Sequence, residues 1–334
     1  MPIIVPTALL ASIPSPSFDR ISIGPLNLRL YGLMIALGVI AAVWLFGKRL
    51  EERGYGTRDD ASAIGMWGVA GGVVGARLYH VVTDWHRFKD NLGDIPKIWE
   101  GGLGVPGGIA LGVVVGVYAG RQRGIPPLVV MSLAAPSLPL AQAIGRWGNW
   151  FNQELYGRPT DLPWALEIDP AHNAGHPEGT TFHPAFLYES LWNLALCGVL
   201  LWIDRRWGNR LAPGKLLAVY VLGYGVGRLW IESLRIDPAS ELGGLRWNQW
   251  MAMALIVGGI VWLVAGRRRE WPVPASPAHD DVLPDDVLDD VLPDDESFDE
   301  LAALDGVDPD ALDPDTLDAV ADPPEFPELD RADP

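Results

Sequence analysis

Long apolar stretches constrain the fold of this chain more than any other feature. Seven of them follow one another, at Leu28–Phe46, Ala61–Val82, Leu103–Ala119, Leu128–Ile144, Phe186–Ile203, Leu216–Ile231 and Trp250–Ala265. Most reach the roughly 17–25 residues that cross a bilayer core as a helix, and the sixth is a little short. They lack the alternation of barrel strands, and backbone polar groups in lipid must be satisfied internally. The sequence therefore predicts an all-α polytopic membrane protein with seven transmembrane helices.

Charge divides the 334 residues into two parts. Residues 271–334 hold 22 acidic residues and one basic residue, Arg331, whereas the preceding body is mildly basic. The 15 Trp and 38 Gly of the chain are types that membrane proteins use often. A single cysteine, Cys197, excludes a disulfide framework. We expect a membrane-embedded domain over residues 1–270 and a disordered acidic tail over residues 271–334.

Basic residues are concentrated in alternate connections between the apolar stretches. They are Lys48, Arg49, Arg53, Arg58, Arg121, Arg123, Arg205, Arg206, Arg210, Lys215, Arg267, Arg268 and Arg269. Because connections rich in Lys and Arg remain in the cytoplasm, this pattern predicts an N-terminus outside and a cytoplasmic C-terminus.

The most polar segment at a helix end is the run Gly145–Gly157, which reads GRWGNWFNQELYG. Arg146 and Asn149 are three residues apart and would share one face of a helix. Neighbouring glycines such as Gly148 would let a ligand approach the backbone. A guanidinium beside an amide suits a phosphate at the level of the lipid headgroups. Anchoring of Arg and Trp at the membrane interface explains the same residues equally well.

A second polar group closes the sixth apolar stretch. Tyr224, Arg228 and Glu232 are spaced by four residues and Arg235 follows three later, so we expect all four on one helix stripe. Arg228 and Glu232 would form a structural ion pair, or Arg228 would face Arg146 as the second cation of an anion site.

Two further residues stand beside or within apolar stretches. Glu189 lies inside the fifth stretch and requires a partner such as an arginine. Tyr31 begins the first stretch, where an aromatic interfacial anchor is the default interpretation. His172, His176 and His183 lie in a loop without the spacing of a metal site, so no metal is expected.

In combination, these segments resemble the bacterial prolipoprotein diacylglyceryl transferase family. The run Gly145–Gly157 matches the family signature Gly-Arg-x-Gly-Asn-Phe-x-Asn-x-Glu-x-x-Gly, with Trp150 in place of the usual Phe. Four other segments match in the same order: Tyr31–Met34, Gly101–Leu103, His183–Glu189 and Tyr224–Arg235. The resemblance covers about residues 20–266 and leaves the acidic tail outside it.

The resemblance implies a reaction in the bacterial plasma membrane. The diacylglyceryl group of phosphatidylglycerol would be transferred to the lipobox cysteine of a preprolipoprotein signal peptide, forming a thioether and releasing glycerol 1-phosphate. This is the first step of lipoprotein maturation. The implied partners are phosphatidylglycerol, the signal peptide and the lipid bilayer; no cofactor and no nucleic acid are implied.

The resemblance also implies roles for individual residues. Catalytic roles would belong to Arg146, Arg228, Asn149, Glu154 and Tyr31, and substrate binding to Arg146, Asn149, Gly148, Asn152, Gly157, Glu189, Tyr224, Glu232 and Arg235. Many relatives carry a histidine, viewed as a candidate base, where this chain has Pro106. Since proline takes no proton, we expect the two arginines to favour the thiolate by their positive field.

The main alternative is a membrane transporter for an anionic solute, because intramembrane arginines also mark substrate paths. A secondary transporter would show two related halves with interrupted helices in matching positions. The sequence contains no such internal repeat.

Overall fold

A computed structural model describes residues 12–24, 26–208, 210–265 and 270–274. The chain separates into Met1–Ala275 and Ser276–Pro334, and all described residues lie in the first unit. Within that unit the structure is mostly helical. Three short antiparallel pairs of strands, which the sequence does not predict, accompany the helices: β1 (Arg20–Ile23) with β2 (Leu26–Arg29), β3 (Leu166–Glu167) with β4 (Thr181–Phe182), and β5 (Glu241–Leu242) with β6 (Leu245–Arg246).

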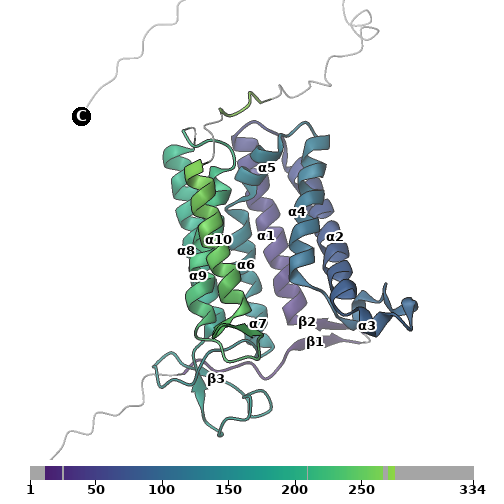
Figure 1. The fold of residues 1–334 in the computed structure, drawn as a ribbon, viewed down its shortest axis with the longest axis vertical. Coiled ribbons are helices and arrows are strands. Elements are labelled where there is room, and N and C mark those ends of the chain that lie inside the picture. Colours follow the sequence, from purple (N-terminus) through teal and green to yellow (C-terminus); the bar gives the residue numbers. More distant parts are fainter. Residues whose placement is uncertain (1–11, 25, 209, 266–269, 275–334) are drawn as a thin grey trace, which may run out of the picture. The chain divides into compact units, whose positions relative to one another are not determined.

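Every predicted apolar stretch coincides with a helix or, for the fourth, with a broken series of helices. The long helices are α1 (Leu30–Glu52), α2 (Arg58–Thr83), α4 (Val105–Gln122), α8 (Ala185–Trp207), α9 (Lys215–Glu232) and α10 (Trp247–Ala265). The fourth stretch forms α5 (Pro127–Ala134), α6 (Ser137–Gly145) and α7 (Trp147–Phe151). A short α3 (Trp85–Phe88) and two 3₁₀ turns, Leu92–Asp94 and Ile98–Glu100, lie between α2 and α4. In Figure 1, α8, α9 and α10 stand together, α2 and α4 form the other side, and α1, α5 and α6 lie between them.

Four helices, α1, α2, α8 and α10, are long and apolar enough to cross a membrane. The pair Pro127–Ala134 and Ser137–Phe151, bent by 45°, makes a fifth if it counts as one span. The 18 residues of α9 include Lys215, Arg228 and Glu232, which reduce its mean hydropathy. The described residues thus support a membrane protein with four to five candidate spans, fewer than the seven that the sequence predicts.

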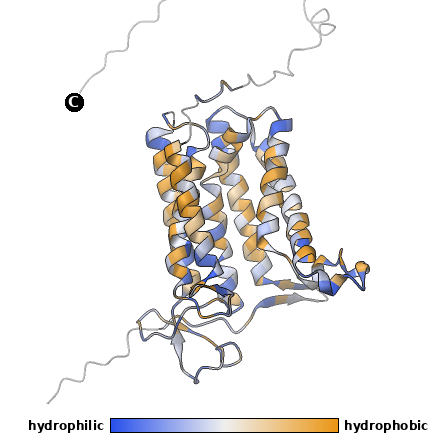
Figure 2. Cartoon of the chain, in the orientation of Figure 1, coloured by the Kyte–Doolittle hydropathy of each residue, from blue (hydrophilic) through white to orange (hydrophobic). Residues whose placement is uncertain are grey.

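The outer faces of the helices are apolar. Figure 2 shows hydrophobic residues along the middle of the helices and hydrophilic residues near their ends. Large side chains are exposed there, including Ile40 at 64%, Met66 at 65% and Val264 at 81%. Contiguous apolar surface of this kind is rare on soluble proteins and indicates contact with lipid.

Glycines bring α2 and α4 into close contact. A Cβ added to Gly75 would lie 2.3 Å from the carbonyl oxygen of Gly107. Conversely, a Cβ added to Gly107 would lie 2.3 Å from the carbonyl oxygen of Gly75. Small residues of this kind are how membrane helices approach closely. Arg77 of α2 stabilises the segment that connects α2 to α4. Its guanidinium donates hydrogen bonds to the carbonyl oxygens of Asp94, Ile95, Gly101 and Gly102. The sequence gives no sign of this role.

The break between α5 and α6 follows from proline. Pro136 has no N–H to donate to the carbonyl of Ser132, and its ring displaces the preceding turn. Arg49 of α1 donates to this carbonyl of Ser132 and to the neighbouring carbonyl of Leu133. Its Nη2 also lies 2.9 Å from Oδ2 of Asp204 on α8. A buried cation therefore holds the broken helix in place and is itself neutralised.

The first residues of the predicted tail pack on the helical body. The indole Nε1 of Trp271 donates to the carbonyl oxygens of Gly208 and Leu211, at 3.1 and 2.7 Å. The guanidinium carbon of Arg53 lies 5.4 Å from the centre of the Trp271 ring, and Tyr55 packs beside it. Residues 275–334 and Arg267–Arg269 lie outside the described residues, so the disorder of the tail and the basic segment after α10 remain predictions.

We expect Trp271→Ala to lower the free energy of unfolding by about 2 kcal/mol, because it removes a half-buried ring and a cation–π contact. Deletion of residues 275–334 should leave it unchanged. Thermal unfolding of the purified chain in detergent measures both. If the two variants lost equal stability, the contacts of Trp271 would not be the cause of the loss.

Candidate functional site

A buried carboxylate joins two arginines from separate helices. Glu189, near the start of α8, has a side chain only 6% exposed. Its Oε2 contacts Nε of Arg146, at the junction of α6 and α7, and its Oε1 lies 3.4 Å from Nη1 of Arg228 on α9. The expectation that Glu189 has an arginine partner is confirmed. Arg146 and Arg228 lie on either side of one carboxylate, as in the two-cation arrangement considered from the sequence.

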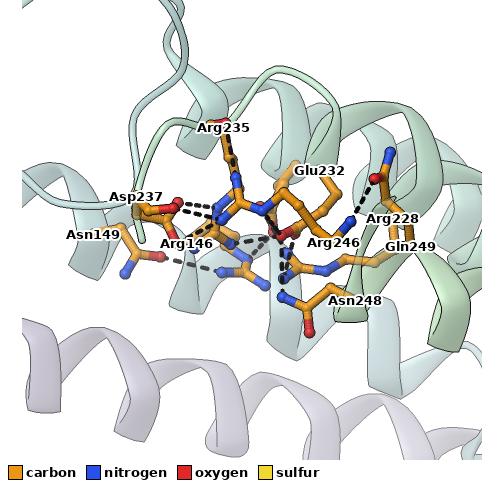
Figure 3. Close-up of polar contacts among 10 residues, drawn as sticks. Arg146, Asn149, Arg228, Glu232, Arg235, Asp237, Arg246, Asn248 and Gln249 are labelled. Carbon is orange, nitrogen blue, oxygen red and sulfur yellow. Dashed lines mark hydrogen bonds and ion pairs between the residues drawn. The ribbon is translucent and has the colours of Figure 1, made fainter. Parts of the chain in front are cut away.

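Asn149 connects Arg146 to the acidic end of the signature run. Nη1 of Arg146 donates to Oδ1 of Asn149 at 3.4 Å, which confirms that the two side chains lie on one side (Figure 3). Nδ2 of Asn149 donates to Oε1 of Glu154 at 2.8 Å, and Asn152 donates to the same oxygen at 3.4 Å. The amide is therefore oriented by a cation on one side and a carboxylate on the other.

The turn after α7 is held in an unusual backbone conformation. Gln153 and Leu155 have φ angles of 51° and 59°, in the left-handed region that non-glycine residues rarely adopt. Gln153 fixes the turn: its Nε2 donates to Oδ2 of Asp169 at 2.6 Å, and its Oε1 accepts from the backbone N–H of Asp169 at 2.8 Å. This strained turn positions Glu154 beside Asn149. The amino-acid sequence alone gives no sign of this role of Gln153.

Two glycines of the run are required for packing. A Cβ on Gly148 would lie 2.7 Å from Cδ2 of Tyr31, so the Tyr31 ring occupies the space that was expected to admit a ligand. A Cβ on Gly157 would lie 2.7 Å from Cβ of His183 and 3.1 Å from the carbonyl oxygen of Leu234. Gly148 therefore brings Tyr31 of α1 next to the signature run, and Gly157 lets the segment after α9 approach it.

On the far side of Arg228, a second carboxylate is surrounded by positive and amide groups (Figure 3). The fully buried Glu232 places Oε2 2.7 Å from Nη2 of Arg228 and 3.8 Å from Nη1 of Arg235. Its Oε1 lies 3.0 Å from Nε of Arg246 and accepts from Asn248 at 3.1 Å. Since α9 ends at Glu232, the prediction that Arg235 lies on the same helix stripe is wrong. Arg235 reaches Glu232 from beyond the helix end.

Asp237 completes this group. Arg235 holds it with two nitrogens, Nε at 2.7 Å from Oδ1 and Nη2 at 2.9 Å from Oδ2, and Nη2 of Arg246 lies 3.0 Å from Oδ2. Burial acts to raise the pKa of Asp237, but the two guanidinium groups outweigh it and hold that pKa below its usual value. Arg246, Asp237 and Asn248 were not predicted from the sequence; the one available signal was a basic residue, Arg246, four positions before the last apolar stretch.

A cavity of about 550 Å³ lies among α1, α2, α4, α5, α6 and α9. Apolar side chains and glycines form most of its walls, and Ser137, Gln142 and Tyr220 add polar groups. Nε2 of Gln142 donates to the hydroxyl of Tyr220 at 2.8 Å. Tyr224 packs against Tyr220, with ring centroids 6.0 Å apart. Among the predicted site residues, Tyr224 thus contacts a residue of the cavity wall.

Comparisons with known proteins identify the family of the chain. The family model described as prolipoprotein diacylglyceryl transferase matches residues 19–265, from the start of β1 to the end of α10. Relatives named phosphatidylglycerol–prolipoprotein diacylglyceryl transferase include one from Frankia alni, 50% identical over 263 residues, covering 77% of this chain and 68% of the relative. Another, from Streptomyces griseus, is 48% identical over 260 residues, covering 76% of this chain and 78% of the relative. A third, from Bifidobacterium adolescentis, is 42% identical over 266 residues, covering 75% and 79%. The chain belongs to the prolipoprotein diacylglyceryl transferase family.

Proposed function

We propose that this chain transfers the diacylglyceryl group of phosphatidylglycerol to the lipobox cysteine of preprolipoproteins. The observation that carries the proposal is the pair of arginines, Arg146 and Arg228, joined by buried Glu189 at one end of apolar helices in a member of this family. The relatives' names supply the lipid and the protein substrate. The direct test is formation of a diacylglyceryl thioether on a lipobox peptide.

The leaving group determines what the site must supply. The S–C bond forms at a glycerol carbon as the C–O bond to phosphate breaks, and glycerol 1-phosphate departs. Negative charge grows on that phosphate, so fixed donors aimed at it stabilise the transition state. We propose that Arg146, Arg228 and Asn149 are those donors, and that Tyr31, Glu154 and Asn152 shape the pocket around them. Glu189 would fix the positions of Arg146 and Arg228 by ion pairs, and Glu232 would do the same for Arg228.

The thiol has to lose its proton before or during attack. A cysteine with a pKa of about 8.5 is mostly protonated at neutral pH, and nearby cations favour the thiolate. Pro106, in the first turn of α4, takes no proton. We propose that the positive field of Arg146 and Arg228 assists deprotonation, with the proton passing to the departing phosphate or to solvent.

The cavity supports a place for the lipid chains. Gln142, in its wall, lies one helical turn before Arg146, so the apolar space and this arginine are neighbours along α6. A diacylglyceryl group needs such an arrangement, with its acyl chains among apolar side chains and its glycerol beside the cations. We propose that the cavity receives an acyl chain of phosphatidylglycerol.

Filling the cavity should impair transfer from long-chain lipid. We expect Ala141→Phe to lower kcat/KM for long-chain phosphatidylglycerol about tenfold, because the ring takes the space of several methylene groups. A short-chain phosphatidylglycerol should be affected less. Val264→Phe, at a position 81% exposed on α10, is the matched control and should change neither value. An equal loss with both lipids would contradict an acyl-chain site here.

We also propose that α1, α2, α4, the α5–α7 series, α8, α9 and α10 each cross the bacterial inner membrane. The N-terminus would then lie outside, and the acidic tail would be a disordered cytoplasmic segment. The alternate basic connections support this orientation. Membership in the transferase family does not favour the anion transporter.

A further inference from the structure

Seven charged side chains of alternating sign contact one another in series through the site. Their order is Arg146, Glu189, Arg228, Glu232, Arg246, Asp237 and Arg235. An arginine stands at each end, so four cations face three carboxylates. This network carries one excess positive charge in a largely buried environment, where charges are weakly screened.

Arg246 enters this network from a different element. It ends β6, directly before α10, and its side chain is 11% exposed. Besides its contacts with the carboxylates of Glu232 and Asp237, it donates through Nη1 to the carbonyl oxygen of Arg235 at 2.7 Å. It also donates through Nη2 to that of Asp237 at 2.8 Å. These bonds fix the guanidinium behind Glu232.

The carboxylate of Glu232 is divided between two arginines. Oε2 faces Arg228 at 2.7 Å, and Oε1 faces Arg246 at 3.0 Å. If Arg246 were neutral, Glu232 would be left with Arg228 at 2.7 Å and the more distant Arg235 at 3.8 Å. More of the charge of Arg228 would then be offset by Glu232, and less would remain for an incoming phosphate.

We propose that Arg246 is a positioning residue that sets the charge of the site. It neutralises Glu232, so that Arg228 keeps its attraction for the phosphate of an anionic lipid. This inference rests on the proposed function, and it implies preference for anionic over zwitterionic phospholipids.

The test is the KM of the full chain for phosphatidylglycerol in mixed micelles, with a lipobox peptide as acceptor. Arg246→Gln should raise KM about tenfold or more, the range for losing a charge-assisted interaction, with kcat changed much less. Arg246→Lys should retain most of the affinity. The double variant Arg246→Gln/Asp237→Asn removes one charge of each sign and should recover much of the lost affinity. Asp237→Asn alone should lower KM.

Arg121→Gln, an exposed position in the last turn of α4, is the control for a general loss of positive charge and should leave KM unchanged. A double variant as impaired as Arg246→Gln would overturn the inference, because charge balance would then be irrelevant. A loss of kcat at constant KM in Arg246→Gln would also overturn it. If Arg246→Gln does not fold, Asp237→Asn decides, and an unchanged KM in that variant would overturn the inference. Absence of product from the unaltered chain contradicts the proposed function itself and the inference with it.

Discussion

We expect Arg146→Ala to abolish diacylglyceryl transfer and Arg146→Lys to restore little of it, the largest effect of any single substitution. The guanidinium uses Nε to contact Glu189 and Nη1 to contact Asn149, which sets the plane of the fork. A lysine ammonium carries the charge but lacks the planar fork that binds phosphate with two nitrogens. Loss of one such donor costs about 10²–10³-fold in kcat.

The measurement is the initial rate of adduct formation on a lipobox peptide, with folding checked by thermal unfolding in the same detergent. Arg121→Lys is the matched control, since that residue is exposed at the end of α4. Near-normal activity in Arg146→Lys would contradict a two-nitrogen contact with phosphate and leave Arg146 as a general positive charge.

The second large effect concerns stability. Glu232→Ala should lower the free energy of unfolding by about 3–5 kcal/mol, because removing one partner of a buried ion pair leaves the other charges uncompensated. This cost applies in full to Glu232, because its side chain is completely buried. Its carboxylate contacts Arg228 at 2.7 Å and Arg246 at 3.0 Å. Glu232→Gln keeps the shape and some hydrogen bonds and should cost less.

Unfolding of the purified chain in detergent measures this difference. Glu241→Ala, at an exposed carboxylate in β5, provides the control and should change stability little. A Glu232→Ala variant as stable as the control would show that Arg228 and Arg246 do not depend on this carboxylate.

Local sequence information was sufficient to predict the helices and two contacts of the site. Apolar stretches became helices because burial in lipid and helical hydrogen bonding depend on a continuous run of residues. The contact of Arg146 with Asn149 followed from a spacing of three on a continuing helix. The need of Glu189 for a cation followed from its place within an apolar run.

Contacts between distant segments were beyond such reasoning. Arg246 meets Glu232 only because the β5–β6 turn folds back over the end of α9, and no spacing rule relates the two positions. Likewise Arg49, on another helix, donates to the carbonyl of Ser132 that Pro136 leaves without its helical donor. Arg235 was wrongly placed on the stripe of α9 because residue spacing alone does not indicate where a helix stops.

Transfer by the purified full chain in detergent tests the proposed reaction directly. Phosphatidylglycerol and a lipobox peptide serve as substrates, and a Cys→Ser peptide serves as the control. Mass spectrometry detects the adduct, and a coupled assay detects glycerol phosphate. We predict a diacylglyceryl adduct on the cysteine peptide alone, with glycerol phosphate released in equal amount. Folded, lipid-binding chain that forms no adduct would contradict the account and would favour an anion transporter, with Pro106 marking a lost activity.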